Sequence, residues 1–251
     1  MIKNKSSLTL TLTALFIGLV FLFTVSFQLY LPATRGFFNL GEGAIYLAAL
    51  IGGPIVGAIA GGVGSMLADI FLGYTHYALG TLIIKGTEGL LVGVLAQKLS
   101  KSLLSKSKNS SMLLSGCIIA ALSLTMIILG NKFYTGTAEI YLISFSFPYS
   151  SNLVSLELVS AIWLIMSLLL IIITINLIRN SPDHTALIIA MCIGGIQMVL
   201  GYFLYQQFIL GVAALAEIPF NVLQMLIGIT IANYIYRGYK QFAPKKYLND
   251  E

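Results

Sequence analysis

The 251-residue chain is dominated by apolar side chains, with 58% hydrophobic and 9% charged residues, and its mean hydropathy is +0.93. A soluble domain carries about 25% charged residues, so this composition excludes a soluble protein and predicts one integral membrane domain over residues 1–251. The net charge of +5 comes from Lys and Arg at the ends of apolar stretches. It does not indicate binding to nucleic acid.

Membrane spans follow from the apolar stretches, since a span takes about 20 apolar residues. Clear candidates are 8–31, 80–99, 112–131, 155–178, 185–207 and 212–236. Residues 43–72 are long for one span and short for two, and Gly52-Gly53-Pro54 interrupts them. If residues 43–72 cross the membrane twice, Arg35 and Lys132 are the only loop Lys or Arg residues on the outside. The positive-inside rule therefore predicts an inner turn at Gly53-Pro54.

This count predicts an all-α polytopic membrane protein with eight transmembrane helices and both termini in the cytoplasm. The orientation places most of the acidic residues in the outer half of the bundle or in outer loops, which indicates a binding cavity that opens outward. These acids are Glu42, Asp69, Glu88, Glu139, Glu157 and Glu217.

Lys85 and Glu88 lie one helical turn apart inside an apolar stretch. A charge at membrane depth costs about 2.5–3.5 kcal/mol, so the pair either forms an ion pair that holds two helices in register or lines a polar pocket. Glu217, Asn221 and Gln224 share one face of the last predicted helix. They either hydrogen-bond between helices or line the same pocket.

Further polar residues lie toward the outer end of the preceding predicted helix or in the predicted outer loops 31–42 and 73–80. These two loops could close a site. Tyr74 and Tyr77 are either interfacial anchors or ligands, and His76 is expected to be solvated. The others are Asn39, Tyr202, Tyr205, Gln206 and Gln207.

Small residues recur at helical spacing in two places. Gly57, Gly61, Gly64 and Ala68 predict close packing of helices, and Ala14 with Gly18 offers a similar face to another helix or to a partner protein. The two cysteines, Cys117 and Cys192, lie within apolar helices and predict no disulfide, metal site or nucleophile.

Several ordered blocks resemble a known family. Asn39-Leu-Gly-Glu42, Leu47 to Pro54, Ala68-Asp69, Ile83-Ile-Lys-Gly86 and Ala216-Glu-Ile-Pro219 resemble the substrate-binding S component of energy-coupling factor (ECF) vitamin transporters. The subgroup linked to hydroxymethylpyrimidine or pyridoxine is the most similar. The resemblance covers roughly residues 8–100 and 190–237.

The resemblance implies a six-helix bundle with a substrate pocket near the outside, built from the first outer loop and the last three helices. Residues 1–109 then hold helices 1–4, 110–183 an inserted two-helix hairpin with an outer loop, 184–240 helices 5–6, and 241–251 a cytoplasmic tail. It also implies a coupling transmembrane subunit with two ABC ATPases as partners, docked at Ala14 and Gly18. The chain has no phosphate-loop motif of its own.

We therefore expect a vitamin-binding subunit without catalytic residues, cofactor or metal. The expected substrate-binding residues are Asn39, Glu42, Lys85, Glu88, Tyr202, Glu217, Asn221 and Gln224. The alternative is a stand-alone secondary transporter that carries a proton on Lys85/Glu88 or Glu217, although no inverted repeat is evident. A membrane enzyme is disfavoured, because no catalytic constellation is found.

Overall fold

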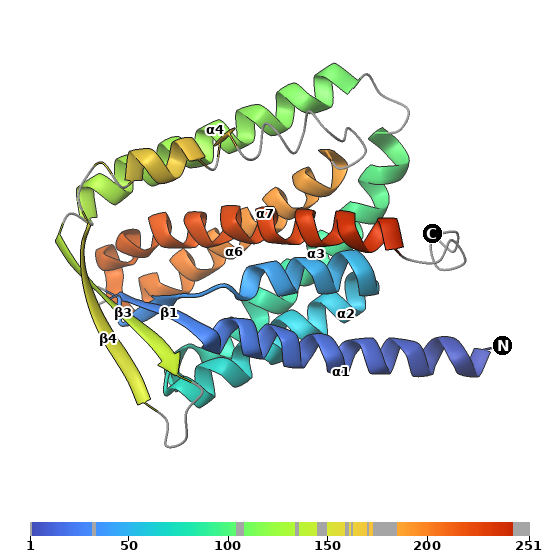
Figure 1. The fold of residues 1–251 in the computed structure, drawn as a ribbon, viewed down its shortest axis with the longest axis horizontal. Helices are drawn as coiled ribbons and strands as arrows, with labels where there is room; N and C mark the ends of the chain where they lie inside the picture. Colours follow the sequence, from blue (N-terminus) through green and yellow to red (C-terminus); the bar gives the residue numbers. More distant parts are fainter. Residues whose placement is uncertain are drawn as a thin grey trace.

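A computed structural model describes residues 2–31, 34–103, 108–133, 136–144, 150–158, 161, 163–169, 171–172 and 185–242. It is a bundle of long helices with a small sheet at one end (Figure 1). The helices are α1 (Ile2–Ser26), α2 (Gly41–Leu72), α3 (Thr75–Leu103), α4 (Lys108–Phe133), α6 (Thr185–Leu210) and α7 (Ile218–Phe242), with the 3-10 turn η2 (Gly211–Glu217) before α7.

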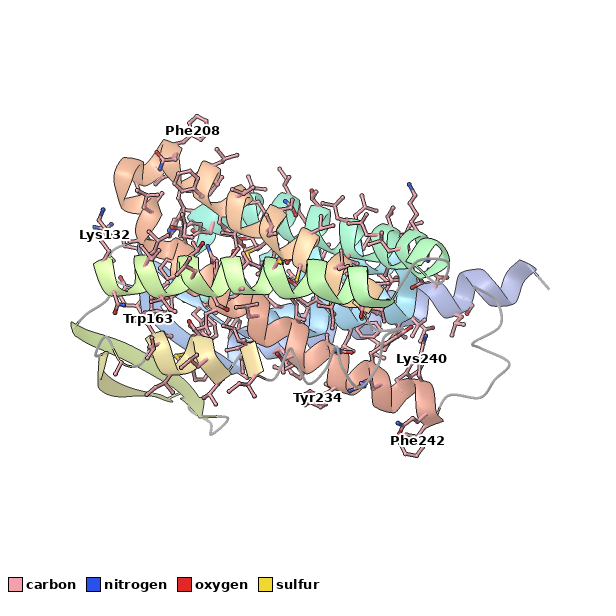
Figure 2. The ribbon with its side chains drawn as sticks, turned by 90° about the horizontal axis from the view of Figure 1, so that it is seen from above. Lys132, Trp163, Phe208, Tyr234, Lys240 and Phe242 are labelled. Atoms are coloured by element: carbon pink, nitrogen blue, oxygen red, sulfur yellow. The ribbon has the colours of Figure 1, made fainter. Side chains whose placement is uncertain are left out.

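Five segments of the described chain are helices long and apolar enough to cross a membrane: Ser7–Ser26, Gly41–Leu72, Thr75–Ser100, Thr185–Leu210 and Ala214–Phe242. Large apolar side chains point outward on many of them; Phe208, for example, is 92% exposed (Figure 2). Such a surface suits contact with lipid, and the prediction of a multi-pass membrane protein is confirmed.

The helix α2 turns back on itself at Gly53, whose backbone is not helical (φ 81°, ψ −176°). A Cβ on Gly57 would lie 2.8 Å from Cα of Ala49, and a Cβ on Gly61 would lie 3.0 Å from a methyl of Ile45. These pairs are symmetric about Gly53, so the two halves run antiparallel. The predicted turn is present, and the first half, residues 41–52, is only roughly 18 Å long.

Glycines bring the second half of α2 into backbone contact with its neighbours. Cβ atoms built on Gly57, Gly61 and Gly62 would each lie within 2.8 Å of a carbonyl oxygen of α3, and one built on Gly64 would lie 2.9 Å from the Ile17 carbonyl of α1. The packing role predicted for the small-residue stripe is therefore confirmed, since only residues without bulky side chains allow such approach.

A four-stranded antiparallel sheet, which the sequence analysis did not predict, lies at one end of the bundle. Its strands are β1 (Phe27–Leu31), β2 (Gly36–Phe38), β3 (Gly136–Ser144) and β4 (Ser150–Leu158), in the order β2-β1-β3-β4. Because of this sheet, two predicted membrane spans have one wrong boundary each. The span 8–31 ends as a helix at Ser26, and 155–158 of the span 155–178 belong to β4.

The physical reason is visible in β4. Val154, Leu156 and Leu158 alternate with Ser155 and Glu157, which is the two-residue period of a strand and not the period of a helix. Averaging hydropathy over a long window concealed this alternation. Helical residues follow at 161, 163–169 and 171–172.

This later helical stretch packs onto the bundle through Trp163, which is buried and meets the Phe220 ring of α7 edge-on at 5.1 Å between centroids. Residues 173–184, which would complete the inserted hairpin, and the tail 243–251 lie outside the described residues. The eight-helix count and the domain boundaries therefore stay predictions.

Charge differs between the two ends of the bundle. Figure 1 shows that α1 begins and α7 ends at the end opposite the sheet. Among described cations, that end carries Lys3, Lys5, Lys98, Lys101, Lys108, Arg237 and Lys240. Arg35 and Lys132 belong to the sheet end.

Candidate functional site

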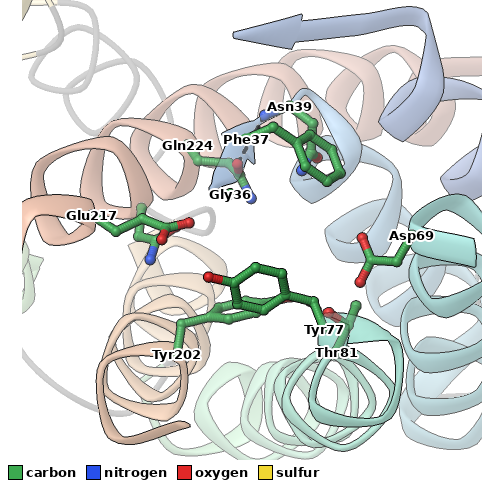
Figure 3. A pocket seen from close by; sticks show the side chains of 10 residues that line it. Gly36, Phe37, Asn39, Asp69, Tyr77, Thr81, Tyr202, Glu217 and Gln224 are labelled. Atoms are coloured by element: carbon green, nitrogen blue, oxygen red, sulfur yellow. Dashed lines mark hydrogen bonds between the residues drawn. The ribbon is translucent and has the colours of Figure 1, made fainter. Parts of the chain in front are cut away.

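A cavity of about 30 Å³ lies at the sheet end, among side chains from five parts of the chain (Figure 3). Its size corresponds to two or three water molecules, so a larger occupant requires the walls to move apart. The lining residues are Gly36, Phe37, Asn39, Asp69, Tyr77, Thr81, Tyr202, Glu217, Asn221 and Gln224.

Five of the eight predicted binding residues line this cavity: Asn39, Tyr202, Glu217, Asn221 and Gln224. The other three, Glu42, Lys85 and Glu88, do not line it. They form a separate buried cluster, which we call the Lys85 cluster.

In the Lys85 cluster, the Lys85 ammonium forms an ion pair with Glu42 and lies 3.5 Å from Oε2 of Glu88. The Tyr46 hydroxyl donates a 2.9 Å hydrogen bond to Oε1 of Glu88. All four side chains are buried. The sequence left open whether Lys85 and Glu88 hold helices together or line a pocket, and this geometry favours the first interpretation.

The Lys85 cluster nevertheless touches the cavity wall through Gln224. The Gln224 amide donates a 2.7 Å hydrogen bond to Oε1 of Glu42, and its oxygen accepts a 3.0 Å bond from the backbone N–H of Asn39. Lys85 also lies 5.4 Å from the centroid of the Tyr202 ring. The cluster thus holds residues of the wall in place.

Two carboxylates reach the cavity from different elements. Asp69 is buried near the end of α2. Thr81, which lines the same cavity, accepts a 3.0 Å hydrogen bond from the Tyr202 hydroxyl. Glu217, at the end of η2, accepts a hydrogen bond from the Gln206 amide. The same amide lies 3.3 Å from the Tyr77 hydroxyl, which donates to the Thr34 carbonyl.

The sequence did not single out Gly36, Phe37 or Thr81. It noted Asp69 as an acid of the outer half and as part of a block that resembles the family, but not as a binding residue. The sequence left open whether Tyr77 is an interfacial anchor or a ligand. The Tyr77 side chain lies in the cavity wall. A signal was available in α3, where Tyr77, Thr81, Lys85 and Glu88 follow one another at spacings of four, four and three on one face. That polar face runs from the cavity into the Lys85 cluster.

Comparison with known proteins identifies the family. The family model described as "ECF-type riboflavin transporter, S component" matches residues 4–181, which is most of the chain. The chain belongs to this family. The predicted resemblance to ECF S components is confirmed, and the chain is a multi-pass plasma-membrane protein of a transport family.

Two curated relatives of this S component are informative. It is 51% identical over 70 residues to an uncharacterised protein of Pyrococcus woesei, covering 28% of this chain and 47% of the relative. It is 33% identical over 106 residues to the thiamine precursor transporter HmpT of Lactococcus lactis, covering 42% of this chain and 64% of the relative. The matches thus span about half to two thirds of these relatives. No solved structure matches.

Proposed function

We propose that this S component is the high-affinity substrate-binding subunit of an ECF-type ABC importer. It captures a small vitamin or vitamin precursor from outside and delivers it inward when docked on a coupling subunit. The observation that carries the proposal is the buried polar cavity at one end of the apolar bundle. The similarity to HmpT favours hydroxymethylpyrimidine, pyridoxine or a related heterocycle.

The orientation that we propose places the sheet end outside and both termini in the cytoplasm. The basic residues at the opposite end support it, because cytoplasmic loops carry the excess of Lys and Arg. In a background without Cys117 and Cys192, an impermeant thiol reagent should label Thr75→Cys and spare Lys98→Cys in whole cells. Both positions are exposed. The reverse labelling would overturn the orientation.

For the site, we propose that the five predicted residues in the cavity wall contact the substrate, and that Glu42, Lys85 and Glu88 keep that wall in shape. Glu217→Gln and Asn221→Ala should each lower affinity at least tenfold, about 1.4 kcal/mol, with unchanged expression. Gln97→Ala, on the exposed surface at the far end of α3, is the control and should bind normally. Normal binding by both site variants would refute the assignment.

The partner face that we propose is the Ala14/Gly18 side of α1. Ala14 is exposed, and a Cβ on Gly18 would meet no atom within 4 Å, whereas the other side of α1 packs on Gly64. A coupling transmembrane subunit energised by two ABC ATPases fits this face, since small residues permit close helix contact.

Ala14→Leu combined with Gly18→Leu should abolish ATP-dependent uptake and co-purification of the coupling subunit, yet spare substrate binding. Leu204→Phe, an exposed position of α6, is the control and should support uptake. Unimpaired uptake by the double variant, or proton-driven uptake in cells without an ATPase partner, would favour the secondary transporter with Lys85/Glu88 or Glu217 as proton carrier.

A further inference from the structure

Buried charge in the described part of the chain is unbalanced toward the negative. Four acids are buried, Glu42, Asp69, Glu88 and Glu217, and Lys85 is the one buried base among the described residues. Lys85 is engaged with Glu42 and Glu88. No basic side chain is among the lining residues of the cavity, so Asp69 and Glu217 face it without a counter-charge.

The two carboxylates lie on different sides of the cavity, with the Tyr77 ring between them (Figure 3). Asp69 is only 4% exposed, and its Oδ2 has no hydrogen-bond partner among the described residues. The Asp69 carboxylate points into the cavity (Figure 3). A buried carboxylate oxygen without a donor is costly, and an occupant that brings a donor offsets that cost.

Glu217 lies close to Gly36 of β2 in the cavity wall. A Cβ built on Gly36 would lie 2.6 Å from Oε1 of Glu217. A larger residue at this position of β2 would therefore displace the carboxylate. With Gln206 on the other oxygen, the Glu217 carboxylate is fixed at the edge of the cavity.

The remaining polar groups of the wall are mostly occupied. The hydroxyls of Tyr77 and Tyr202 donate to Thr34 and Thr81, and both ends of the Gln224 amide are engaged. Rings of Phe37, Tyr77 and Tyr202 supply flat apolar surface. Aromatic faces also attract cations.

We propose that the cavity selects a small cationic amino-heterocycle, a planar ring with an exocyclic amine, held between the carboxylates of Asp69 and Glu217. The inference rests on the proposed function and adds the substrate class of the same site. A neutral ring rich in carbonyl acceptors is rejected, because it faces the two carboxylates with lone pairs and leaves them unpaired.

The test is calorimetric binding to the purified full chain, with two probes that differ in one group: 4-amino-5-hydroxymethyl-2-methylpyrimidine and its 4-oxo analogue. Riboflavin is the third probe. We expect the wild type to bind the amino compound at least about tenfold more tightly than the oxo compound. We also expect riboflavin not to compete with it.

Asp69→Asn and Glu217→Gln should each bring the affinities for the amino and the oxo compound to within about threefold of one another. Gln97→Ala, at an exposed position at the far end of α3, is the control and should keep the preference. The wild-type comparison needs no variant, so it tests the inference even where a variant fails to fold.

Two results would separate the inference from the proposed function. Tight binding of riboflavin or of the oxo analogue, unchanged in Asp69→Asn, would overturn the inference that the substrate is a cationic amino-heterocycle. The proposed function as a vitamin-binding subunit would still stand. Binding of none of the three probes, together with uptake that needs no ATPase partner, would overturn both.

Discussion

The Lys85 cluster offers the sharpest test of what a buried charge does in this bundle. Lys85→Met keeps the approximate length of the side chain and removes its charge, which leaves the carboxylates of Glu42 and Glu88 with only the neutral donors Gln224 and Tyr46. Removing one partner of a buried ion pair costs about 3–5 kcal/mol. Because 1 kcal/mol shifts the melting temperature of a chain this size by about 2–4 °C, we expect a drop of about 6–20 °C.

The assay is thermal unfolding of the purified protein in detergent, without substrate. The matched variant adds Glu42→Gln and Glu88→Gln to Lys85→Met, so that no charge stays buried in the cluster. It should recover at least half of the lost melting temperature, since well-packed neutral groups replace an ion pair at little cost. A melting temperature of Lys85→Met within 2 °C of the wild type, or a triple variant as unstable as the single one, would refute this account of the cluster.

Three further substitutions test the wall and the packing. Gly36→Ala should weaken binding about tenfold by displacing the Glu217 carboxylate, while Gly116→Ala, where a Cβ meets nothing within 4 Å, should bind normally. Tyr77→Ala should weaken binding at least about tenfold, because it removes the ring that lines the cavity, and normal affinity would contradict a substrate contact of Tyr77. Gly89→Val should abolish the yield of folded protein by colliding with the Gly57 carbonyl, whereas Gly18→Val should fold.

Sequence reasoning predicted the features that depend on local pattern. The turn at Gly53-Pro54, the small-residue packing of Gly57, Gly61 and Gly64, and the polar face of α7 all follow from spacing along one helix. The position of Asp69 in the cavity depends instead on how α2 meets α3 and α6, which no local pattern contains. Asp69 is therefore visible in the sequence as an acid but not as a cavity residue.

The sheet was missed for a different reason. Its strands are short or adjoin apolar helices, so a window long enough to find membrane spans averages them away. In β3, Thr137, Glu139 and Tyr141 alternate with apolar residues, and a shorter window shows that alternation. The Lys85 cluster was detected by its charges, yet its separation from the cavity needed the packing of α2 against α3.

The sheet order has a consequence for the stretch between α4 and α6. The strand β3 joins the bundle by pairing along β1, from Phe27↔Leu142 to Tyr30↔Glu139, and this attachment is made by main-chain hydrogen bonds that any non-proline sequence can supply. Side chains of β3 are thus free to change while the attachment persists. A chain shortened by 136–158 would leave β1 as an edge strand with open N–H and C=O groups, and such an edge recruits another strand. The shortened protein should associate edge to edge with a second copy of itself.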